Sequence, residues 1–226
     1  MTSKTPTTSL LSTPVYTPRL YSAPTHPSIH NLAKRSLDIV GSLVGLTLTG
    51  IAAVPIAIAM YKQDPGPLLY SQTRCGLNGR RFRIWKFRSM VVGADKLKDQ
   101  VENQAEGCFF KNDQDPRITK VGSFLRRTSL DEFPQFWNVL TGDMSLVGTR
   151  PPTVDEVEQY QPHHWARLNV KPGITGEWQV NGRSSVKDFE AVVKLDVDYQ
   201  RKWSFAYDLQ LILQTIMVVL RKKGAC

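Results

Sequence analysis

The chain has 226 residues, of which 41% are hydrophobic and 22% are charged, so it is long enough for one folded domain with an anchor or a tail. Its formal charge of +9 and its pI of about 9.6 predict a partner that carries phosphate, whether nucleic acid, anionic lipid or nucleotide. The three cysteines are scattered and form no CxxC pair, which argues against a disulfide framework and a structural zinc site.

The first segment, 1–30, is rich in Ser, Thr and Pro and contains no Asp or Glu. Its prolines interrupt every window in which a helix could begin, so we expect a disordered tail. A transit or secretory peptide is the alternative, but the segment is too polar for the apolar core of a signal peptide.

The second segment, 31–63, contains a stretch from Ile39 to Met60 without one charged residue. At about 22 residues it can cross the ~30 Å of hydrocarbon in a bilayer, and a soluble domain of this size rarely needs such a stretch. We therefore predict a helix inserted in a membrane, with a buried core helix as the alternative.

Pro55 lies inside this stretch and predicts a kink, because proline removes one backbone hydrogen bond and clashes with the preceding turn. In lipid the freed carbonyl needs a partner, which a hydroxyl such as that of Thr49 can supply. Basic residues flank both ends, Lys34 before and Lys62 after, and positive residues favour the cytoplasmic side. The pattern fits a re-entrant hairpin with both ends in the cytoplasm; a single span with a bend is the alternative.

The remaining segment, 64–226, is expected to be a small cytosolic domain of the α+β class, mainly helical with short β-strands. A turn at 64–67 precedes two predicted strands, 68–70 and 82–87, around a Gly-Leu-Asn-Gly turn. The polar stretch 93–116 indicates a helix followed by a loop. Further helices are predicted at 118–126, 131–140, 153–168 and 186–202.

The last predicted helix, 208–220, is strongly apolar, with aromatic residues before it and basic residues after it. This arrangement suits a helix at the membrane interface, and a core helix is the alternative. The segment is too short for a second span.

Two adjacent acids, Asp131 and Glu132, stand just before Pro134. Proline is tolerated only in the first turn of a helix, so a regular helix that contains Pro134 should begin no earlier than about Asp131. The two carboxylates would then lie at a helix N-terminus, where they could hold Mg²⁺ or attack a phosphorus atom. The alternative is a helix cap, since Ser129-x-x-Glu132 matches a capping box, although Pro134 would then lie too deep in the helix.

Candidate phosphate ligands are basic residues in alternating or stiff segments. Lys86 and Arg88 alternate with aromatic residues, which places both cations on one strand face; a plain amphipathic strand would look the same. Arg150 lies in a Gly/Pro-stiffened loop, where its fork would match a phosphate, with a solvated surface turn as the alternative. Arg183 follows a tight-turn signal in the glycine-rich stretch 171–184, with a β-hairpin as the alternative.

Six motifs follow one another along the chain: Lys34-Arg35-x-x-Asp38; Asp64-Pro65-Gly66-Pro67; Lys86-Phe87-Arg88-Ser89-Met90; Leu125-Arg126-Arg127-Thr128-Ser129-Leu130-Asp131-Glu132; Gly142-Asp143-Met144-Ser145-Leu146-Val147-Gly148; and Lys171-Pro172-Gly173-Ile174-Thr175-Gly176. Together and in this order they resemble the bacterial sugar transferases, the monotopic polyprenyl-phosphate phosphoglycosyl transferases. Each motif is weak alone, but six in order are highly specific. The resemblance covers the chain from Lys34 to about Lys223.

The resemblance implies a reaction. In the family, the aspartate of the Asp-Glu pair attacks a UDP-sugar, releases UMP and carries a covalent phospho-sugar, which then passes to polyprenyl (undecaprenyl) phosphate. By position Asp131 is the nucleophile, and Glu132 with Asp131 forms the Mg²⁺ site. The resemblance also implies that Arg150 and Pro151 lie in the nucleotide-binding loop and that Arg183 lies near the phosphates. The full set of predicted substrate-binding residues is Lys86, Arg88, Arg150, Pro151, Gln179, Asn181 and Arg183.

The resemblance also implies a location. The family's membrane element is a re-entrant helix bent at a proline, here Pro55, on the cytoplasmic face of the bacterial inner membrane. The expected partners are the UDP-sugar, polyprenyl phosphate and membrane lipid, and not nucleic acid; the oligomeric state stays open, with a homodimer as one alternative. The chain is similar to the compact members, which lack an extra four-helix membrane region, and its product would enter surface polysaccharide or glycoconjugate synthesis.

Three positions depart from the family pattern. Thr149 replaces a frequent proline, which predicts a less rigid arginine loop. Val54 replaces the serine of a frequent Ser-Pro pair, and Glu177 adds a negative charge near a predicted phosphate site. Two other functions stay open: a membrane-tethered phosphohydrolase that uses the same carboxylates, and a basic module that binds nucleic acid or anionic lipid without catalysis. The sequence identifies neither the sugar nor the pathway.

Overall fold

The computed structural model describes residues 25–104, 108, 110, 112, 114–181, 186 and 188–220. Most of the segment predicted to be a disordered tail therefore lies outside the described residues. Its end forms a short 3-10 helix, Pro27–Ile29, which His26 caps. The ring of His26 also lies 3.0 Å from the carbonyl oxygen of Gln200 and edge-on to Trp203. The prediction of disorder is wrong for residues 25–30, because contacts with a distant helix hold this proline-rich stretch.

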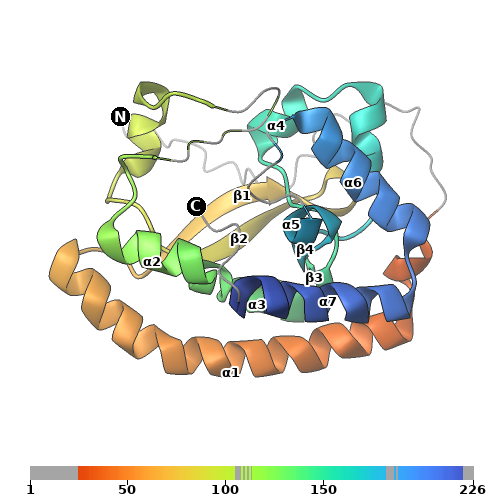
Figure 1. The fold of residues 1–226 in the computed structure, drawn as a ribbon, viewed down its shortest axis with the longest axis horizontal. Helices are drawn as coiled ribbons and strands as arrows, with labels where there is room; N and C mark the ends of the chain where they lie inside the picture. The colour runs from red at the N-terminus through yellow and green to blue at the C-terminus, as the bar shows by residue number, and fades with distance from the viewer. Residues whose placement is uncertain are drawn as a thin grey trace, which may run out of the picture.

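The central element is an antiparallel pair of strands, β1 (Leu69–Cys75) and β2 (Arg81–Phe87), with Tyr70 opposite Lys86 (Figure 1). The connection contains Asn78 with a positive φ of 53°, a conformation that Asn tolerates better than most residues. The two predicted strands are confirmed, and β1 runs further than predicted.

A second, parallel pair consists of β3 (Ser145–Val147) and β4 (Gly173–Thr175). The chain continues from β4 directly into α5 (Glu177–Asn181). The β-hairpin alternative for 171–184 is therefore wrong, because β4 pairs with β3 and not with a strand that follows it.

Helices surround the two strand pairs, so the mainly helical α+β class is confirmed (Figure 1). The regular helices are α1 (Leu32–Gln63), α2 (Lys120–Thr128), α3 (Gln135–Thr141), α4 (Val154–Glu158), α5, α6 (Phe189–Lys202) and α7 (Phe205–Leu220). The polar stretch after β2 contains a 3-10 helix, Ala94–Gln100. The single helix predicted at 153–168 is wrong: α4 ends at Glu158 and a 3-10 helix, Pro162–Asn169, begins at a proline that lacks the N–H for a continuous helix.

The helix α1 is continuous and is long and apolar enough to cross a membrane. Pro55 lies inside it without interrupting it, and the two ends of α1 lie at opposite ends of the molecule (Figure 1). The hydroxyl of Thr49 donates to the carbonyl of Gly45 at 2.7 Å, and not to the carbonyl of Ile51 that Pro55 leaves without its usual donor. The prediction that this hydroxyl serves the freed carbonyl is therefore wrong. The described helix bends without turning back on itself.

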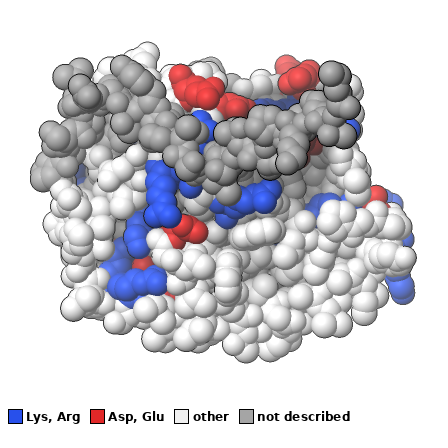
Figure 2. Space-filling view, turned by 180° about the vertical axis from the view of Figure 1, so that it is seen from behind, with Lys and Arg blue, Asp and Glu red and all other residues white. Residues whose placement is uncertain are grey.

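One face of α1 packs on the domain along its length. Near its start, the carboxylate of Asp38 accepts hydrogen bonds from the Ser145 hydroxyl and the Leu146 N–H, both at 2.9 Å. Near its end, Ile56 and Met60 belong to a buried apolar cluster under α2. The opposite face is exposed and apolar; its large side chains are Leu32, Ile39, Val40, Leu43, Val44, Leu48, Ile51, Val54, Ile58 and Tyr61. Figure 2 shows the same lower edge of the molecule almost without charged side chains, with Lys and Arg above it.

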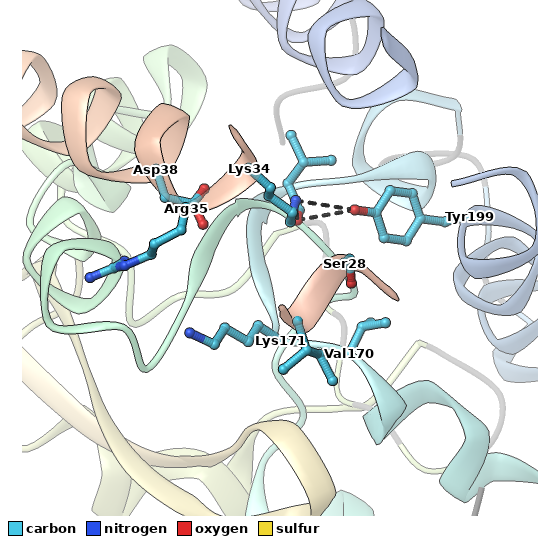
Figure 3. A pocket seen from close by; sticks show the side chains of 9 residues that line it. Ser28, Lys34, Arg35, Asp38, Val170, Lys171 and Tyr199 are labelled. Atoms are coloured by element: carbon cyan, nitrogen blue, oxygen red, sulfur yellow. Dashed lines mark hydrogen bonds between the residues drawn. The ribbon is translucent and has the colours of Figure 1, made fainter. Parts of the chain in front are cut away.

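The first turn of α1 carries two cations that contact different helices of the domain. Lys34 is buried and points toward Tyr199 of α6, whereas Arg35 points away from it (Figure 3). The ammonium of Lys34 lies 2.6 Å from the Asp208 carboxylate of α7. The guanidinium of Arg35 donates to the carbonyls of Val139 and Leu140 at the end of α3. The basic motif before the apolar stretch therefore anchors α1 to the domain.

The helix α7 also has two faces. Asp208 and Leu211 are fully buried, and Leu211 packs in a cluster with Val147 and Tyr199. The other face exposes apolar side chains, namely Leu209, Leu213, Ile216 and Met217. In Figure 1, α7 is drawn above α1 at the lower side of the molecule, and the Lys34–Asp208 ion pair joins the starts of the two helices. The predicted position of α7 at a membrane interface stays a prediction.

The packing of α1 on α3 can be tested at two glycines. A Cβ atom at Gly45 would lie 2.4 Å from the ring of Phe136, whereas nothing lies within 4 Å of the Cβ position at Gly50. Gly45→Ala should therefore lower the free energy of unfolding by about 1–3 kcal/mol through overpacking. Gly50→Ala should be neutral or raise it by up to about 1 kcal/mol through helix propensity. Denaturant unfolding in detergent measures both, and equal effects would contradict the close approach of α1 to α3.

Candidate active site

The two adjacent acids lie in a tight connection between α2 and α3. Ser129 adopts a left-handed conformation with a φ of 57°, which ends α2, and a 3-10 turn, Leu130–Glu132, follows. The regular helix α3 begins only at Gln135, directly after Pro134, so the limit that the proline sets on the helix start is confirmed. The side chain of Ser129 makes no capping hydrogen bond, which makes the capping-box alternative wrong.

Each acid of the pair has a cation beside it. Asp131 is buried. Burial lowers the pKa of the neighbouring Arg126, and the negative charge of Asp131 is the largest effect that raises this pKa. Glu132 is partly exposed, and its carboxylate lies 3.0 Å from the ammonium of Lys86 on β2. The structure thus brings together the predicted residues Asp131, Glu132 and Lys86. A carboxylate with a cation beside it can approach an anionic phosphate with less repulsion.

Arg126 owes its position to the close packing of α2 on the segment after β2. A Cβ atom at Gly122 would lie 1.8 Å from the carbonyl oxygen of Ser89, so only glycine allows this approach. Thr119 caps α2 and donates its own N–H to the same carbonyl at 3.1 Å. One turn later, the guanidinium of Arg126 donates to the Ser89 hydroxyl at 2.9 Å. Sequence reasoning gave Arg126 no role, because only the fold places it beside Asp131.

A buried amide fixes α3 to β2. The side chain of Asn138 donates to the Arg83 carbonyl at 2.7 Å and accepts from the Trp85 N–H at 3.2 Å. The helix α1 reaches the same region, since the Thr49 hydroxyl lies 3.2 Å from the Phe133 carbonyl. The segment that carries the acid pair is therefore held from two sides, by β2 and by α1.

Arg88 lies in a different environment from Lys86. Its guanidinium pairs with the Asp64 carboxylate, donates to the Asp64 carbonyl and donates to the Pro67 carbonyl at 2.9 Å. These contacts fasten the turn that follows α1. In the structure, the N–H groups of Arg88 donate to the Asp-Pro-Gly-Pro turn. The role of Arg88 as a substrate ligand stays a prediction.

A second polar cluster surrounds Arg150. Its guanidinium forms a two-point ion pair with Glu156, at 2.9 and 3.3 Å, and lies 5.9 Å from the ring centre of Trp178. Burial opposes the charge of Glu156, but Arg150 and then Arg74 outweigh it and hold the pKa of Glu156 below its usual value. The solvated-turn alternative for Arg150 is wrong, since its side chain is only 22% exposed.

Arg74 of β1 lies between the two clusters. It donates to the carbonyl of Pro151 at 3.0 Å, and burial, followed by Arg150, lowers its pKa to about 10. Glu156 and Glu132 act in the opposite direction. Three buried polar atoms in this part of the described chain have no hydrogen-bond partner: Arg74 Nε, Trp178 Nε1 and Gln179 Oε1. Such atoms fit a polar ligand that supplies the missing partners.

The remaining predicted residues are on or after α5. The side chain of Asn181 donates to the Glu177 carboxylate at 3.2 Å. Glu177 also accepts a hydrogen bond from Tyr207 and lies 3.6 Å from the ammonium of Lys202. The negative charge that departs from the family pattern is therefore compensated, and it ties α5 to α6 and α7. Arg183 lies outside the described residues.

Thr149, which stands where the family pattern often has a proline, fixes the arginine loop through hydrogen bonds. It is almost fully buried, and its hydroxyl donates to the Arg167 carbonyl at 3.0 Å. Its own carbonyl accepts the Gly173 N–H at 2.9 Å. These bonds hold the loop where the family pattern often has a proline.

Two groups of side chains in the described part of the chain could hold a metal ion. The oxygens of Asp131 and Glu132 are ligands that Mg²⁺ prefers. A second group, His163, His164 and Glu190, has ligand atoms within 4.8 Å of one another. However, Nδ1 of His164 accepts the Gln161 N–H, so the neutral ring carries its proton on Nε2, which faces Glu190. That nitrogen has no lone pair to offer a metal, and the acid pair is the better candidate.

Comparisons with known proteins agree on one family. Residues 29–222 match the family described as bacterial sugar transferase. The chain is 52% identical over 207 residues to a protein named galactosyl transferase CpsE, from Streptococcus agalactiae serotype III (strain NEM316); the match covers 91% of this chain and 46% of that protein.

Two other relatives differ in the share of their length that is matched. A protein named UDP-glucose:undecaprenyl-phosphate glucose-1-phosphate transferase, from Escherichia coli (strain K12), is 42% identical over 213 residues, 91% of this chain and 44% of that protein. The exopolysaccharide production protein ExoY of Rhizobium meliloti (strain 1021) is 35% identical over 203 residues, 87% of this chain and 89% of that protein. The chain thus spans less than half of the first two relatives and most of the third.

Proposed function

Because the chain belongs to the bacterial sugar transferase family, we propose that it transfers a sugar-1-phosphate from a UDP-sugar to polyprenyl (undecaprenyl) phosphate, a first membrane step in making a surface polysaccharide or glycoconjugate. One observation supports this more than any other: Asp131 and Glu132 lie together, each beside a cation, directly before α3. The names of the relatives agree, since they specify galactosyl transfer and glucose-1-phosphate transfer to undecaprenyl phosphate.

In the first step the Asp131 carboxylate attacks the phosphorus atom that bears the sugar. A bond forms between the Asp131 oxygen and phosphorus, and the bond between phosphorus and the UMP oxygen breaks, so that UMP leaves with the electron pair. Arg126 and Lys86 are placed to stabilise the negative charge that develops on the phosphoryl oxygens.

In the second step an oxygen of polyprenyl phosphate attacks the same phosphorus. The bond to Asp131 breaks, its carboxylate is regenerated, and polyprenyl-diphosphate sugar leaves. A covalent relay suits a water-soluble donor and a membrane-bound acceptor, because each can occupy the site in turn. Ping-pong kinetics follow from it.

Glu132 and Asp131 would hold Mg²⁺, which fits a pair of carboxylates at a site for phosphate oxygens. When bound, the ion would neutralise charge on the diphosphate of the donor. The ammonium of Lys86 lies 3.0 Å from one oxygen of the Glu132 carboxylate, so this cation stands beside the proposed metal ligand.

The cluster around Arg150 would bind the nucleotide. Arg150 and Arg74 supply cations beside the ring of Trp178, and Trp178 Nε1, Gln179 Oε1 and Arg74 Nε are the buried atoms in need of partners. A nucleoside phosphate offers donors, acceptors and a flat ring in one ligand. Asn181 and Arg183 follow on the same stretch of chain and would complete this part of the site.

We place the protein on the cytoplasmic face of the bacterial inner membrane, with both ends of the bent helix α1 on that side, as a re-entrant element requires, and with α7 at the interface. The exposed apolar faces of α1 and α7 and the charges above them support this placement. In a variant without the native cysteines, new cysteines at His30 and Lys62 should both react with an impermeant maleimide added from the cytoplasmic side of inverted vesicles. Labelling of one site only would indicate a helix that crosses the bilayer.

The activity can be tested with the purified protein, Mg²⁺, polyprenyl phosphate and a panel of UDP-sugars that includes UDP-glucose and UDP-galactose. We expect release of UMP and formation of a lipid-linked sugar. Free sugar phosphate without a lipid product would favour the phosphohydrolase alternative. Salt-sensitive binding to nucleic acid or anionic vesicles, with no turnover of any donor, would favour the binding module.

Arg126 and Arg127 provide a matched pair for testing the cation beside Asp131. Arg126 contacts Ser89 and lies near Asp131, whereas Arg127 is exposed on the same helix. Arg126→Gln should lower kcat for UMP release by about 10²-fold or more, the usual effect of removing one stabilising group from a phosphoryl-transfer or oxyanion site. Arg127→Gln should change it less than about twofold. Similar rates for the two variants would remove Arg126 from the site.

A further inference from the structure

An apolar groove lies beside the end of α1 and the turn that leads to β1. It has a volume of about 410 Å³, within the range of small-ligand sites. Its walls include Ala57, Ile58 and Met60 of α1 and Leu68 before β1, and Lys62 is the one cationic residue among the described residues that line it. The groove is separate from the nucleotide cluster around Arg150.

The inner wall of the groove is also the support of the acid pair. Met60 and Leu68 belong to the apolar cluster that includes Leu130 and Phe133. These last two residues stand directly before Asp131 and directly after Glu132 in the chain. A molecule in the groove would therefore contact the same apolar cluster that supports the segment with the proposed nucleophile.

The outer side of the groove is continuous with the exposed apolar face of α1. Ile58 is 54% exposed, and Val54, one turn earlier on the same helix, is 64% exposed. Lys62 follows one turn after Ile58 and is exposed, in the last turn of α1. The order along the helix is thus an apolar face first and a cation last.

We propose that this groove binds the first isoprene units of the polyprenyl phosphate acceptor, with Lys62 attracting its phosphate. The inference rests on the proposed function and adds the place where the second substrate enters. The acceptor is a single apolar chain with one anionic end, and the groove offers apolar walls with one cation toward the end of the membrane-facing helix. The sugar and nucleotide of the donor match these walls poorly, because their polar groups would lose hydrogen bonds to water there.

Filling the groove should impair the acceptor step alone. Ala57→Trp places a large ring among the lining residues, and Val44→Trp places the same ring on the exposed face of α1, more than three helical turns before the groove. We expect Ala57→Trp to raise the KM for polyprenyl phosphate by about tenfold or more, and Val44→Trp to change it less than about twofold. The burst of UMP with donor alone should be unchanged in both variants.

The role of Lys62 can be tested with a matched pair of charge reversals. Lys62→Glu should raise the KM for the acceptor several-fold at low salt, with a smaller effect at high salt, because screening weakens the attraction. Lys96→Glu makes the same charge change at an exposed lysine that does not line the groove and should leave the KM unchanged. An acceptor KM that is equal in the Lys62 and Lys96 variants would overturn the role of Lys62.

A photoreactive polyprenyl phosphate, with a diazirine on its first isoprene unit, gives a readout that does not require turnover. We expect it to label peptides that contain residues 57–68, and Ala57→Trp to abolish that labelling. Labelling elsewhere, or labelling that excess phospholipid removes but polyprenyl phosphate does not, would overturn the proposal in favour of a bulk lipid site. Absence of a UMP burst from the native protein would instead refute the proposed function, and the labelling result would still decide what occupies the groove.

Discussion

Asp131→Asn is expected to abolish UMP release and to prevent the covalent phospho-sugar adduct. The amide keeps the shape of the side chain but lacks the charged oxygen that must bond to phosphorus. Removing the nucleophile of a covalent enzyme lowers kcat by several orders of magnitude, so we expect a loss of about 10⁴-fold or more. Stopped assays of UMP release, and mass spectrometry of the peptide that contains residue 131 after incubation with donor alone, measure the two effects.

The variant should stay folded, which makes the loss interpretable. Asp131 is buried beside Arg126, and an amide in place of the carboxylate would leave that cation with its hydrogen bond to Ser89. Glu132→Gln is the neighbouring comparison: it should weaken Mg²⁺ dependence and lower kcat but still permit a labelled Asp131 peptide. Native-like turnover in Asp131→Asn, or a phospho-sugar on another residue of the native protein, would refute the covalent relay.

Local rules predicted the position of the acid pair well. Pro134 limits where a helix can begin, and α3 indeed starts just after it, with both carboxylates in the preceding turn. The same rules placed the strands around the Asn78 turn and the long apolar helix. These features depend on neighbours in the sequence, so the sequence suffices to find them.

Long-range pairings could not be predicted in the same way. Arg88 alternates correctly with Lys86, but the turn at Asp64 takes its guanidinium, and Arg126 lies beside Asp131 instead. No periodicity distinguishes Arg126 from Arg127. What distinguishes them is the contact of Gly122 with the backbone of Ser89, which sets the orientation of α2.

The sequence patterns identified only part of the polar cluster around Arg150, because its contacts also depend on long-range packing. Arg150 was predicted from its stiff loop, but its ion pair with Glu156 and its contact with Trp178 depend on how α4 and α5 pack. The sequence patterns gave Arg74 no role in the site. Its burial between the two clusters follows from the pairing of β1 with β2 and from its bond to the Pro151 carbonyl.

The buried ion pair between Lys34 and Asp208 should make a large contribution to stability. The two side chains are 7% and 0% exposed and lie 2.6 Å apart, and they join the start of α1 to α7. Asp208 also accepts hydrogen bonds from Tyr199 and from the Trp203 ring nitrogen. Burial, and then Asp208, raise the pKa of Tyr199 well above its usual value, so that its hydroxyl stays a donor. Lys34→Met leaves the buried carboxylate without its cation and should lower the free energy of unfolding by about 3–5 kcal/mol.

Two comparisons separate this pair from ordinary surface charge. The Lys98–Asp155 pair is 3.3 Å apart with side chains 48% and 72% exposed, so Lys98→Met should change the free energy of unfolding by about 1 kcal/mol or less. The double variant Lys34→Met/Asp208→Asn removes both charges and should be more stable than the sum of the two single losses predicts, because neither charge is then left buried alone. Denaturant unfolding in nanodiscs measures all four variants. Additive losses, or a Lys34→Met loss no larger than that of Lys98→Met, would mean that α1 and α7 are held together by apolar packing rather than by this pair.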